Sequence, residues 1–543
     1  MCSLRAIDVY SGVGGWSLGL ALAGIEVVCS YEWSEVANET NRTNNGHPTK
    51  SVNIRTMDLS ELPSGIDVVV GSPPCTQFSY SNRGGGGNLS DGLKDIVRFF
   101  EIVEACKPKF WAMENVPRVA AIMEREFAEQ GALHRFAHLG PLFKIISADK
   151  IGLPQRRKRC LVSNCDLGGI DAFAAQPPVL GQVVQALKTD LVVDPIYDLQ
   201  CPRSAITDLT YEANLNEEEI RINGASKALH PVYNVMQFPD PLDRTSRTVT
   251  ATCTRVSRES IVIHDVEQGG YRRLSLREKA CLQGFPVSFQ FMADSHGAKE
   301  VMIGNAMPPP LAYQIGHVMQ GTPRENIPPL SSLHAQLRTA SLRAPLTAPH
   351  DGSTHKYSAH RRFQFAIPSL HLKSGVRFEM INDSHVEQTL WAVEFVFGSS
   401  KDIFRIRPND TIAQEILPGE GVPQGAKKHI FEFQATLAQM DVRRMQTLWA
   451  HRGPGGTRPF ALLDELSTVG SALAYDLAPL DSLDLAAQLK TALSAHFAPL
   501  QLVGFEKLKF NVHKVVSGIL LGAAANALLC PENPSRAINA SRT

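Results

Sequence analysis

A mostly aliphatic run over residues 66–70 stops at Gly71 and at the pair Pro73-Pro74, and Cys75 follows directly. The run has the length and β-branched composition of a buried strand, and the glycine and prolines end it. Cys75 is therefore expected on a loop at the carboxyl end of a strand, the edge of an open α/β sheet where ligands bind. A glycine-rich segment, residues 80–92, comes next. A thiol followed by such a segment is typical of a nucleophile with a lid, although a buried structural cysteine fits the same residues equally well.

A second strand pattern, residues 6–10, runs into a turn that holds three glycines between residues 12 and 15. Glycines at such a turn let the backbone approach a ligand closely, at the start of a helix expected from Trp16 to Gly24. The spacing is not the dinucleotide pattern Gly-x-Gly-x-x-Gly. The turn indicates a nucleotide site, with an ordinary strand-to-helix turn as the alternative.

A third strand, residues 26–31, ends in Glu32 and Trp33, about 20 residues after the glycine turn. An acid at this place can accept hydrogen bonds from ribose hydroxyls, and an adjacent indole can stack on an adenine. Asp58, further along, is a candidate acceptor for an adenine amino group. The alternative is a surface acid beside a packing aromatic.

Two more segments carry polar residues at strand ends. Residues 110–113 form a strand pattern that ends in Glu114-Asn115, so Glu114 is expected on the same sheet edge as Cys75. The basic tetrad 156–159 leads into another short strand. A solvated charge run is the ordinary alternative for that tetrad.

Length and composition bound what the chain can be. At 543 residues it should form about two to four domains, and its formal net charge of zero means that any nucleic-acid site must be a local basic face. Ten cysteines without a Cys-x-x-Cys pair argue against a zinc ribbon or a disulfide scaffold, and the N-terminus shows no apolar signal region. A reduced, cytoplasmic location is expected. The longest apolar stretch, residues 515–530, is shorter than a bilayer span and is expected to be a buried helix.

Taken together, these motifs resemble the DNA (cytosine-5)-methyltransferase family over about residues 5–320. Eight motifs stand in the order of that family and at plausible spacings: residues 8–15, Glu32-Trp33, Pro73-Pro74-Cys75, Glu114-Asn115-Val116, Gln155-x-Arg157-x-Arg159, residues 247–251, residues 276–278 with 283–286, and residues 304–309. Each motif alone is weak, but the ordered set is specific. The chain has Tyr10 where the family more often has Phe, and Thr76 precedes the Gln77 that commonly follows the cysteine directly.

The resemblance implies an α/β fold with a doubly wound, mostly parallel, Rossmann-like sheet. It places the catalytic domain at residues 1–164 and 270–320 and a small target-recognition region at 165–269. A Pro- and Ser-rich stretch, 321–355, is predicted to be a linker with one short helix. Residues 356–543 are predicted to be a separate α+β domain of unknown role.

The family chemistry assigns the reacting groups. Cys75 would add to C6 of cytosine, Glu114 would hydrogen-bond or protonate N3, and Arg157 and Arg159 would contact the O2 edge. The implied methyl donor is S-adenosylmethionine, and no metal is expected. The residues predicted to hold the donor are Tyr10, Gly12, Gly14, Gly15, Glu32, Trp33, Asp58, Leu59, Pro73 and Asn305.

The implied partner is double-stranded DNA, from which the target base is flipped out under the lid of residues 80–92. A restriction endonuclease of the same system, a monomeric state and no membrane association are also expected. Arg203, Arg221 and Asn223 are candidates for base contacts. Phosphate contacts are expected from within a second set: Arg244, Arg247, Arg255, Arg258, Arg272 and Arg273. Methylation of cytosine in transfer RNA and a non-catalytic DNA-binding relic are the alternatives.

The C-terminal region resembles no family. Strands are expected at 361–372, 376–381, 390–397 and 403–406, and helices at 485–497 and 515–530. Asp410 and Glu432 faintly suggest a nuclease acid pair. Additional contacts to DNA or to a partner are the more ordinary interpretation.

Overall fold

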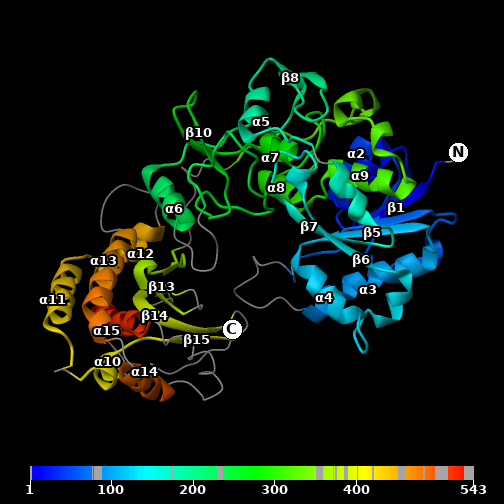
Figure 1. Cartoon of the computed structure of the whole chain (residues 1–543). Helices are drawn as coiled ribbons and strands as arrows, with labels where there is room; N and C mark the ends of the chain where they lie inside the picture. The colour runs from blue at the N-terminus through cyan, green and yellow to red at the C-terminus, as the bar shows by residue number, and fades with distance from the viewer. Residues whose placement is uncertain are drawn as a thin grey trace. The chain divides into compact units, whose positions relative to one another are not determined.

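The computed structural model describes residues 3–75, 78, 89–173, 175–228, 236–349, 359–370, 372, 376–384, 389–399, 402–418, 421–450, 459–480, 483–495 and 511–530. These residues fall into two compact units, one formed by the described residues up to 349 and one by those from 359 onward (Figure 1). Each unit has its own sheet and helices.

A seven-stranded sheet in the order β3-β2-β1-β4-β5-β7-β6 forms the centre of the first unit. The first five strands in this order run parallel, and β7 runs antiparallel to both of its neighbours. The strands are β1 Arg5–Val9, β2 Glu26–Glu32, β3 Thr49–Ser51, β4 Val68–Gly71, β5 Phe110–Asn115, β6 Leu142–Ser147 and β7 Lys158–Ser163. The predicted mostly parallel sheet is confirmed.

Helices cover both faces of this sheet (Figure 1). Val69 and Trp111 point to the face covered by α3 and α4, whereas Val70 and Ala112, their neighbours along the strands, pack with α1 and α9. The helices are α1 Gly15–Leu22, α2 Glu35–Asn45, α3 Leu89–Cys106, α4 Arg118–Phe127, α5 Leu180–Ala186, α6 Glu217–Ala228, α7 Leu276–Leu282, α8 His296–Asn305 and α9 Pro309–Gln320.

The last helix of the first unit lies against the first one. A Cβ built on Gly19 of α1 would lie 2.3 Å from the carbonyl oxygen of Pro309, so only glycine lets α1 and α9 approach this closely. A Cβ on Gly15 would lie 1.9 Å from the carbonyl oxygen of Met307. The segment before α9 therefore runs along the start of α1.

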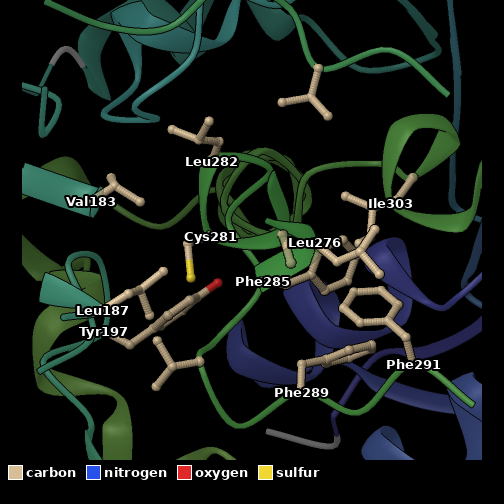
Figure 2. Close-up of a cluster of buried hydrophobic side chains, with 14 of the residues drawn as sticks. Val183, Leu187, Tyr197, Leu276, Cys281, Leu282, Phe285, Phe289, Phe291 and Ile303 are labelled. Atoms are coloured by element: carbon tan, nitrogen blue, oxygen red, sulfur yellow. The ribbon is translucent and has the colours of Figure 1, made fainter. Parts of the chain in front are cut away.

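A third hydrophobic core joins the predicted target-recognition region to the catalytic part of the first unit. Figure 2 shows Val183 of α5, Leu187 directly after that helix and the ring of Tyr197 around Cys281 and Leu282 of α7. The Tyr197 hydroxyl donates to the carbonyl oxygen of Gly284 at 2.8 Å. Four short strands complete this region: β8 Leu191–Val193, β9 Gln200–Pro202, β10 Val262–Asp265 and β11 Gly270–Arg273.

The stretch predicted to be a linker packs against the first unit as far as residue 349. It has no α-helix but three short 3-10 turns at Arg324–Asn326, Leu330–Ser332 and His334–Gln336. Leu333 is buried in the core of Figure 2, which explains why this Pro-rich segment is held in place. The prediction of one short helix is wrong because the apolar residues recur too sparsely to cover a helical face.

The predicted lid is only partly described. Residues 79–88 lie outside the described residues, and residues from Leu89 onward already belong to α3. Residues 89–92 thus form the first turn of a helix, and the lid itself stays a prediction.

The second unit contains an antiparallel sheet in the order β12-β13-β14-β15. Its elements are β12 Gln364–Ala366, β13 Arg377–Ser384, β14 Thr389–Ser399, β15 Asp402–Ile406, α10 Asp410–Ile416, α11 Gln424–Ala438, α12 Val442–Ala450, α13 Pro459–Leu477, α14 Leu483–Ser494 and α15 Val512–Leu529. The α+β character is confirmed, but α10 to α13 were not predicted and the first strand is much shorter than expected.

Helix α15 packs against the sheet of the second unit. A Cβ on Gly518 would overlap the ring of Phe378, at 2.1 Å from Cε2. Among the described residues it is the one helix long and apolar enough to cross a membrane, and 78% of that apolar window is buried within the protein. It is a core helix, as the sequence indicated.

The suggested nuclease acid pair is not assembled. Asp410 is the first residue of α10 and Glu432 lies on α11, and both side chains are exposed. In the part of the chain that the structure describes, no three His, Cys, Asp or Glu side chains form a cluster that could hold a metal ion.

Candidate active site

Three strands bring the predicted reacting groups to one edge of the large sheet. Cys75 follows the end of β4, and Glu114 lies near the end of the parallel strand β5. Strand β7 runs the other way, so its start lies at this same edge, where Cys160 pairs with Asn115. The register thus brings Arg159 beside Glu114.

Glu114 and Arg159 form a buried ion pair. The Nε atom of Arg159 lies 2.5 Å from Oε1 of Glu114, and the two side chains are 12% and 7% exposed. Arg159 also donates from Nη1 to the carbonyl oxygen of Lys158 at 2.7 Å. A buried carboxylate needs such a partner, and the pair in turn fixes the direction of the arginine.

The Cys75 thiol lies within the electrostatic reach of this pair. Burial raises the pKa of Cys75 above its usual value, and the negative charge of Glu114 raises it further. Arg159 and Arg157 oppose this increase. The thiolate needed for nucleophilic attack is therefore controlled by the charges of three side chains around it.

Hydrogen bonds from neighbouring elements hold the Cys75 loop. Asn115 donates from Nδ2 to the carbonyl oxygen of Pro73 at 3.1 Å, and its Oδ1 accepts from the Val116 amide at 2.8 Å. The indole of Trp16 donates to Oγ of Ser72 at 3.0 Å. The loop is thus tied both to β5 and to the helix after the glycine turn.

Arg157 joins the segment around Val249 to the end of α8. Its guanidinium donates to the carbonyl oxygens of Val249 at 2.9 Å and Gly304 at 2.8 Å, and the side chain is buried. Among the described residues its Nε atom has no hydrogen-bond partner. The predicted contact of Arg157 with the O2 edge of cytosine stays a prediction, and these two hydrogen bonds add a positioning role.

Gln155, two residues before Arg157, supports the same junction. Its Nε2 donates to Oε1 of Gln283 at 2.7 Å, and its Oε1 accepts from the Val249 amide at 2.7 Å. Alternation along the extended chain explains the pattern: Gln155 and Arg157 point inward, whereas Arg156 and Lys158 are exposed. Within the basic tetrad, Arg157 is therefore buried in the protein, whereas Arg156 and Lys158 face the solvent.

The glycine turn and the end of β2 form the candidate donor pocket. The carboxylate of Glu32 accepts from the amides of Gly12 and Ser34, each at 3.0 Å. The indole of Trp33 is 69% exposed beside it. Gly14 has a left-handed φ of 86°, and a Cβ there would lie 2.2 Å from Oδ1 of Asn41, so glycine is required at this position.

Tyr10 closes the side of this pocket nearest α3. It has a left-handed φ of 54°, which is uncommon for a bulky residue, and its hydroxyl donates to Oδ1 of Asp95 at 3.2 Å. Arg55 binds the same carboxylate with two nitrogens, at 2.8 and 2.7 Å. Asp95 and Arg55 were not singled out from the sequence, because only the pairing of two distant segments reveals them.

The remaining predicted donor residues have varied surroundings. Asp58 is exposed and caps a short 3-10 turn by accepting from the Ser60 amide at 2.9 Å, which lowers its pKa. Leu59 is half-buried, Pro73 is buried in the Cys75 loop, and Asn305 is exposed at the end of α8. Asp58 is thus free to face a ligand.

Several residues predicted to contact DNA are internal ion-pair partners. Arg247 binds Asp240, Arg255 binds Glu219, Arg272 binds Glu278, and Arg273 binds Glu300. Asn223 is fully buried and donates to two backbone carbonyls, and Arg203 bonds to the carbonyl of Leu187. The predicted base contacts of Asn223 and phosphate contacts of these four arginines are wrong, because nearby carboxylates and carbonyls already engage them. Arg221 and Arg244 are exposed, whereas Arg258 is buried.

Comparison with known proteins agrees with this arrangement. The family model of C-5 cytosine-specific DNA methylase matches residues 4–321. The type II methyltransferase M.FnuDI of Fusobacterium nucleatum is 27% identical over 339 residues, which cover 59% of this chain and 95% of that protein. M.NgoPII of Neisseria gonorrhoeae is 27% identical over 341 residues, with 59% and 96% covered.

The glycine turn, the thiol loop and the acid–arginine pair all lie within the residues that the family model matches. The chain belongs to the C-5 cytosine-specific DNA methylase family. The predicted family is confirmed.

The charges around Cys75 give a prediction about its reactivity. Glu114→Gln removes a negative neighbour, so the pKa of Cys75 should fall. Arg159→Gln removes a positive neighbour, so that pKa should rise. The rate of Cys75 alkylation by iodoacetamide, followed by peptide mass spectrometry from pH 7 to 11, measures both shifts.

Cys106 is the internal control for this experiment. Burial alone raises the pKa of its thiol to about 11, so neither substitution should change its alkylation. Shifts of Cys75 in the same direction in both variants, or in neither, would contradict the electrostatic account.

Proposed function

We propose that this protein methylates C5 of a flipped-out cytosine within a specific double-stranded DNA sequence, using S-adenosylmethionine. The observation that supports this most is the Cys75 thiol beside the buried Glu114–Arg159 pair, on the same sheet edge as the glycine turn. The relatives are type II methyltransferases, so a restriction endonuclease that cuts the same sequence is the proposed counterpart.

The candidate donor pocket suits S-adenosylmethionine. The Glu32 carboxylate is held at the glycine turn by two amides, where it can accept from ribose hydroxyls, and Trp33 offers an exposed face to an adenine. Gly12 has a left-handed φ of 52°, and a Cβ built there would meet no atom within 4 Å, so the backbone at Gly12 is open to close approach by a ligand. The donor, when bound, supplies an electrophilic methyl group.

Cys75 supplies the nucleophile in this proposal. C5 of cytosine is a weak nucleophile, and addition of the thiolate to C6 makes C5 electron-rich enough to accept a methyl group. The thiol must first lose its proton, which Arg159 and Arg157 favour and Glu114 opposes. A proton must leave C5 before the thiolate is eliminated. No described side chain is assigned to remove it.

Glu114 and Arg159 stabilise the charge that addition creates. Electron density moves toward N3 and O2 of the ring. Glu114 in its protonated form, having taken up a proton equivalent to the one that the thiol releases, can donate it to N3, while a guanidinium at O2 stabilises the oxygen, and both lower the barrier. The ion pair at 2.5 Å presets the direction of both groups before the base arrives. Flipping the base out of the duplex costs about a few kcal/mol, which contacts in this pocket must offset.

A methyl-transfer assay tests the proposal. Purified protein with radiolabelled S-adenosylmethionine should label unmethylated duplex DNA and leave transfer RNA unlabelled. Cys75→Ala should lower the rate by at least about 10³-fold, because the covalent step is lost. Labelling of RNA alone would favour the RNA alternative, and full activity of Cys75→Ala would refute the covalent mechanism.

The exposed cations of the basic tetrad give a second prediction, on DNA binding. Arg156 and Lys158 are exposed beside the active site, and among the described residues no carboxylate pairs with either. They are therefore available for phosphates, unlike the neutralised arginines further on. Arg156→Gln with Lys158→Gln should reduce the slope of log K against log salt by about 1.8, measured by fluorescence anisotropy on duplex DNA.

A matched control comes from the opposite edge of the sheet. Lys107 and Lys109 are exposed just before β5, far along the strand from Cys75. Lys107→Gln with Lys109→Gln makes the same charge change and should leave the slope unchanged. Equal slopes for the two double variants would show that Arg156 and Lys158 do not contact phosphates.

A further inference from the structure

A segment beyond the family match is an integral part of the first unit. The family match ends at residue 321, yet residues 330–346, here called the strap, pack onto the methyltransferase unit. Leu333 is 2% exposed and Ala344 is 4% exposed, and Leu337 packs against the same core as Leu333. Two apolar anchors thus fix the strap, and the residues between them cross the surface.

The first half of the strap binds the end of α2. The Arg338 guanidinium lies flat against Gly46, where a Cβ would be only 2.0 Å from its Nη1 atom. Nη1 donates to the carbonyl oxygen of Asn45 at 3.3 Å, and the Ser341 amide donates to that of Thr43 at 3.1 Å. The last carbonyls of a helix lack partners within the helix, so the strap satisfies them.

The same turn of α2 holds the glycine turn of the donor pocket. Asn45 donates from Nδ2 to the carbonyl oxygen of Gly14 at 3.2 Å and to Oδ1 of Asn41 at 2.8 Å. At its other end, α2 begins beside Glu32, whose carboxylate accepts from the Ser34 amide. Helix α2 therefore connects both walls of the donor pocket, and the strap holds its free end.

The second half of the strap binds a different part of the unit. Arg343 donates from Nη2 to the carbonyl oxygen of Ser204 at 3.0 Å. The Ala344 amide donates to Oε1 of Gln290 at 2.9 Å, which also accepts from Thr207. Ser204 and Thr207 belong to the predicted target-recognition region, and Gln290 belongs to the segment between α7 and α8.

A buried lysine strengthens this second junction. Lys299 of α8 donates to the carbonyl oxygen of Pro345 at 2.7 Å and to Oδ1 of Asp208 at 2.6 Å. Lys299 and Asp208 are both buried, so the strap carbonyl takes part in satisfying a charge inside the protein. Lys299 binds Asp208 directly and also binds the strap carbonyl, so residues 204–208, α8 and the strap meet at this lysine.

We propose that the strap is a positioning element with two separable halves. Arg338 and Ser341 position α2 and, through Asn45, the methyl-donor turn. Arg343 and Ala344 position residues 204–208 and, through them, the part of the chain that recognises DNA. The inference rests on the proposed function, because it assumes that the glycine turn binds S-adenosylmethionine. It extends the catalytic unit by about 25 residues beyond the family's usual end.

The test compares single substitutions in the full chain. Arg338→Ala should weaken the binding of S-adenosylhomocysteine, measured by calorimetry, about three- to tenfold, with little change in the Michaelis constant for plasmid DNA. Arg343→Ala should raise the Michaelis constant for plasmid DNA and leave the binding of S-adenosylhomocysteine within twofold of wild type. Arg338→Ala combined with Ser341→Pro should weaken donor-site binding further, because the second contact to α2 is removed.

Leu346→Ala provides the control, because this strap side chain is 85% exposed and should affect neither measurement. Melting temperatures are measured for all variants, since a general loss of stability would shift both affinities together. Two results would overturn the strap proposal alone. One is unchanged binding of S-adenosylhomocysteine in the double variant. The other is that the Arg338 and Arg343 variants lose donor-site binding and DNA affinity to the same extent. Absence of binding by the wild-type protein overturns the proposed function, and the strap proposal with it.

Discussion

The antiparallel pairing of β7 with β5 is the constraint on which the active site depends. The strands β3, β2, β1 and β4 run parallel to β5. If β7 also ran parallel to β5, its first residues would lie at the opposite edge of the sheet. The reversal puts the start of β7 at the carboxyl edge, where Cys160 faces Asn115 and Arg159 meets Glu114. The ion pair, the Cys75 electrostatics and the inward direction of Arg157 all follow from this single register.

The protein uses its arginines in two distinct ways. Many of those after residue 240 are neutralised within the fold; Arg272, for example, is fully buried between Asp265 and Glu278. Such groups stabilise the structure only because each charge has a partner, and they add nothing to the field that attracts DNA. With a net charge of zero, the chain offers no overall positive field to phosphates. Arg156 and Lys158, both exposed, are the cations near Cys75 that the proposed function uses for this purpose.

The sequence predicted the parts of the site that local patterns encode. A strand followed by Gly71 and two prolines located Cys75, and the pattern of residues 110–115 located Glu114 on the same edge. It could not predict which arginines are free, because Arg247 and Asp240 become partners only through folding. The same limit hid Asp95, the partner of Tyr10, which lies 85 residues away in the chain.

The strap shows a further limit of sequence patterns. Prolines and serines in residues 321–349 indicated a linker, yet Leu333 and Ala344 anchor the segment in the first unit. Sparse anchors give no periodicity, so only the folded structure reveals them. In the second unit, α13 was missed although Leu462, Leu466, Val469 and Leu473 recur at helical spacing, so its pattern could have been found from the sequence.

The central claim is that Cys75 bonds to C6 of a cytosine in duplex DNA. A duplex carrying 5-fluorocytosine at the recognised position tests it directly, because fluorine cannot leave C5 as a proton does and the adduct persists. With S-adenosylmethionine present, the account predicts a denaturation-resistant protein–DNA complex whose cross-linked peptide contains Cys75. Absence of that complex with a duplex whose unfluorinated form is methylated, or a cross-link at another residue, would contradict the account.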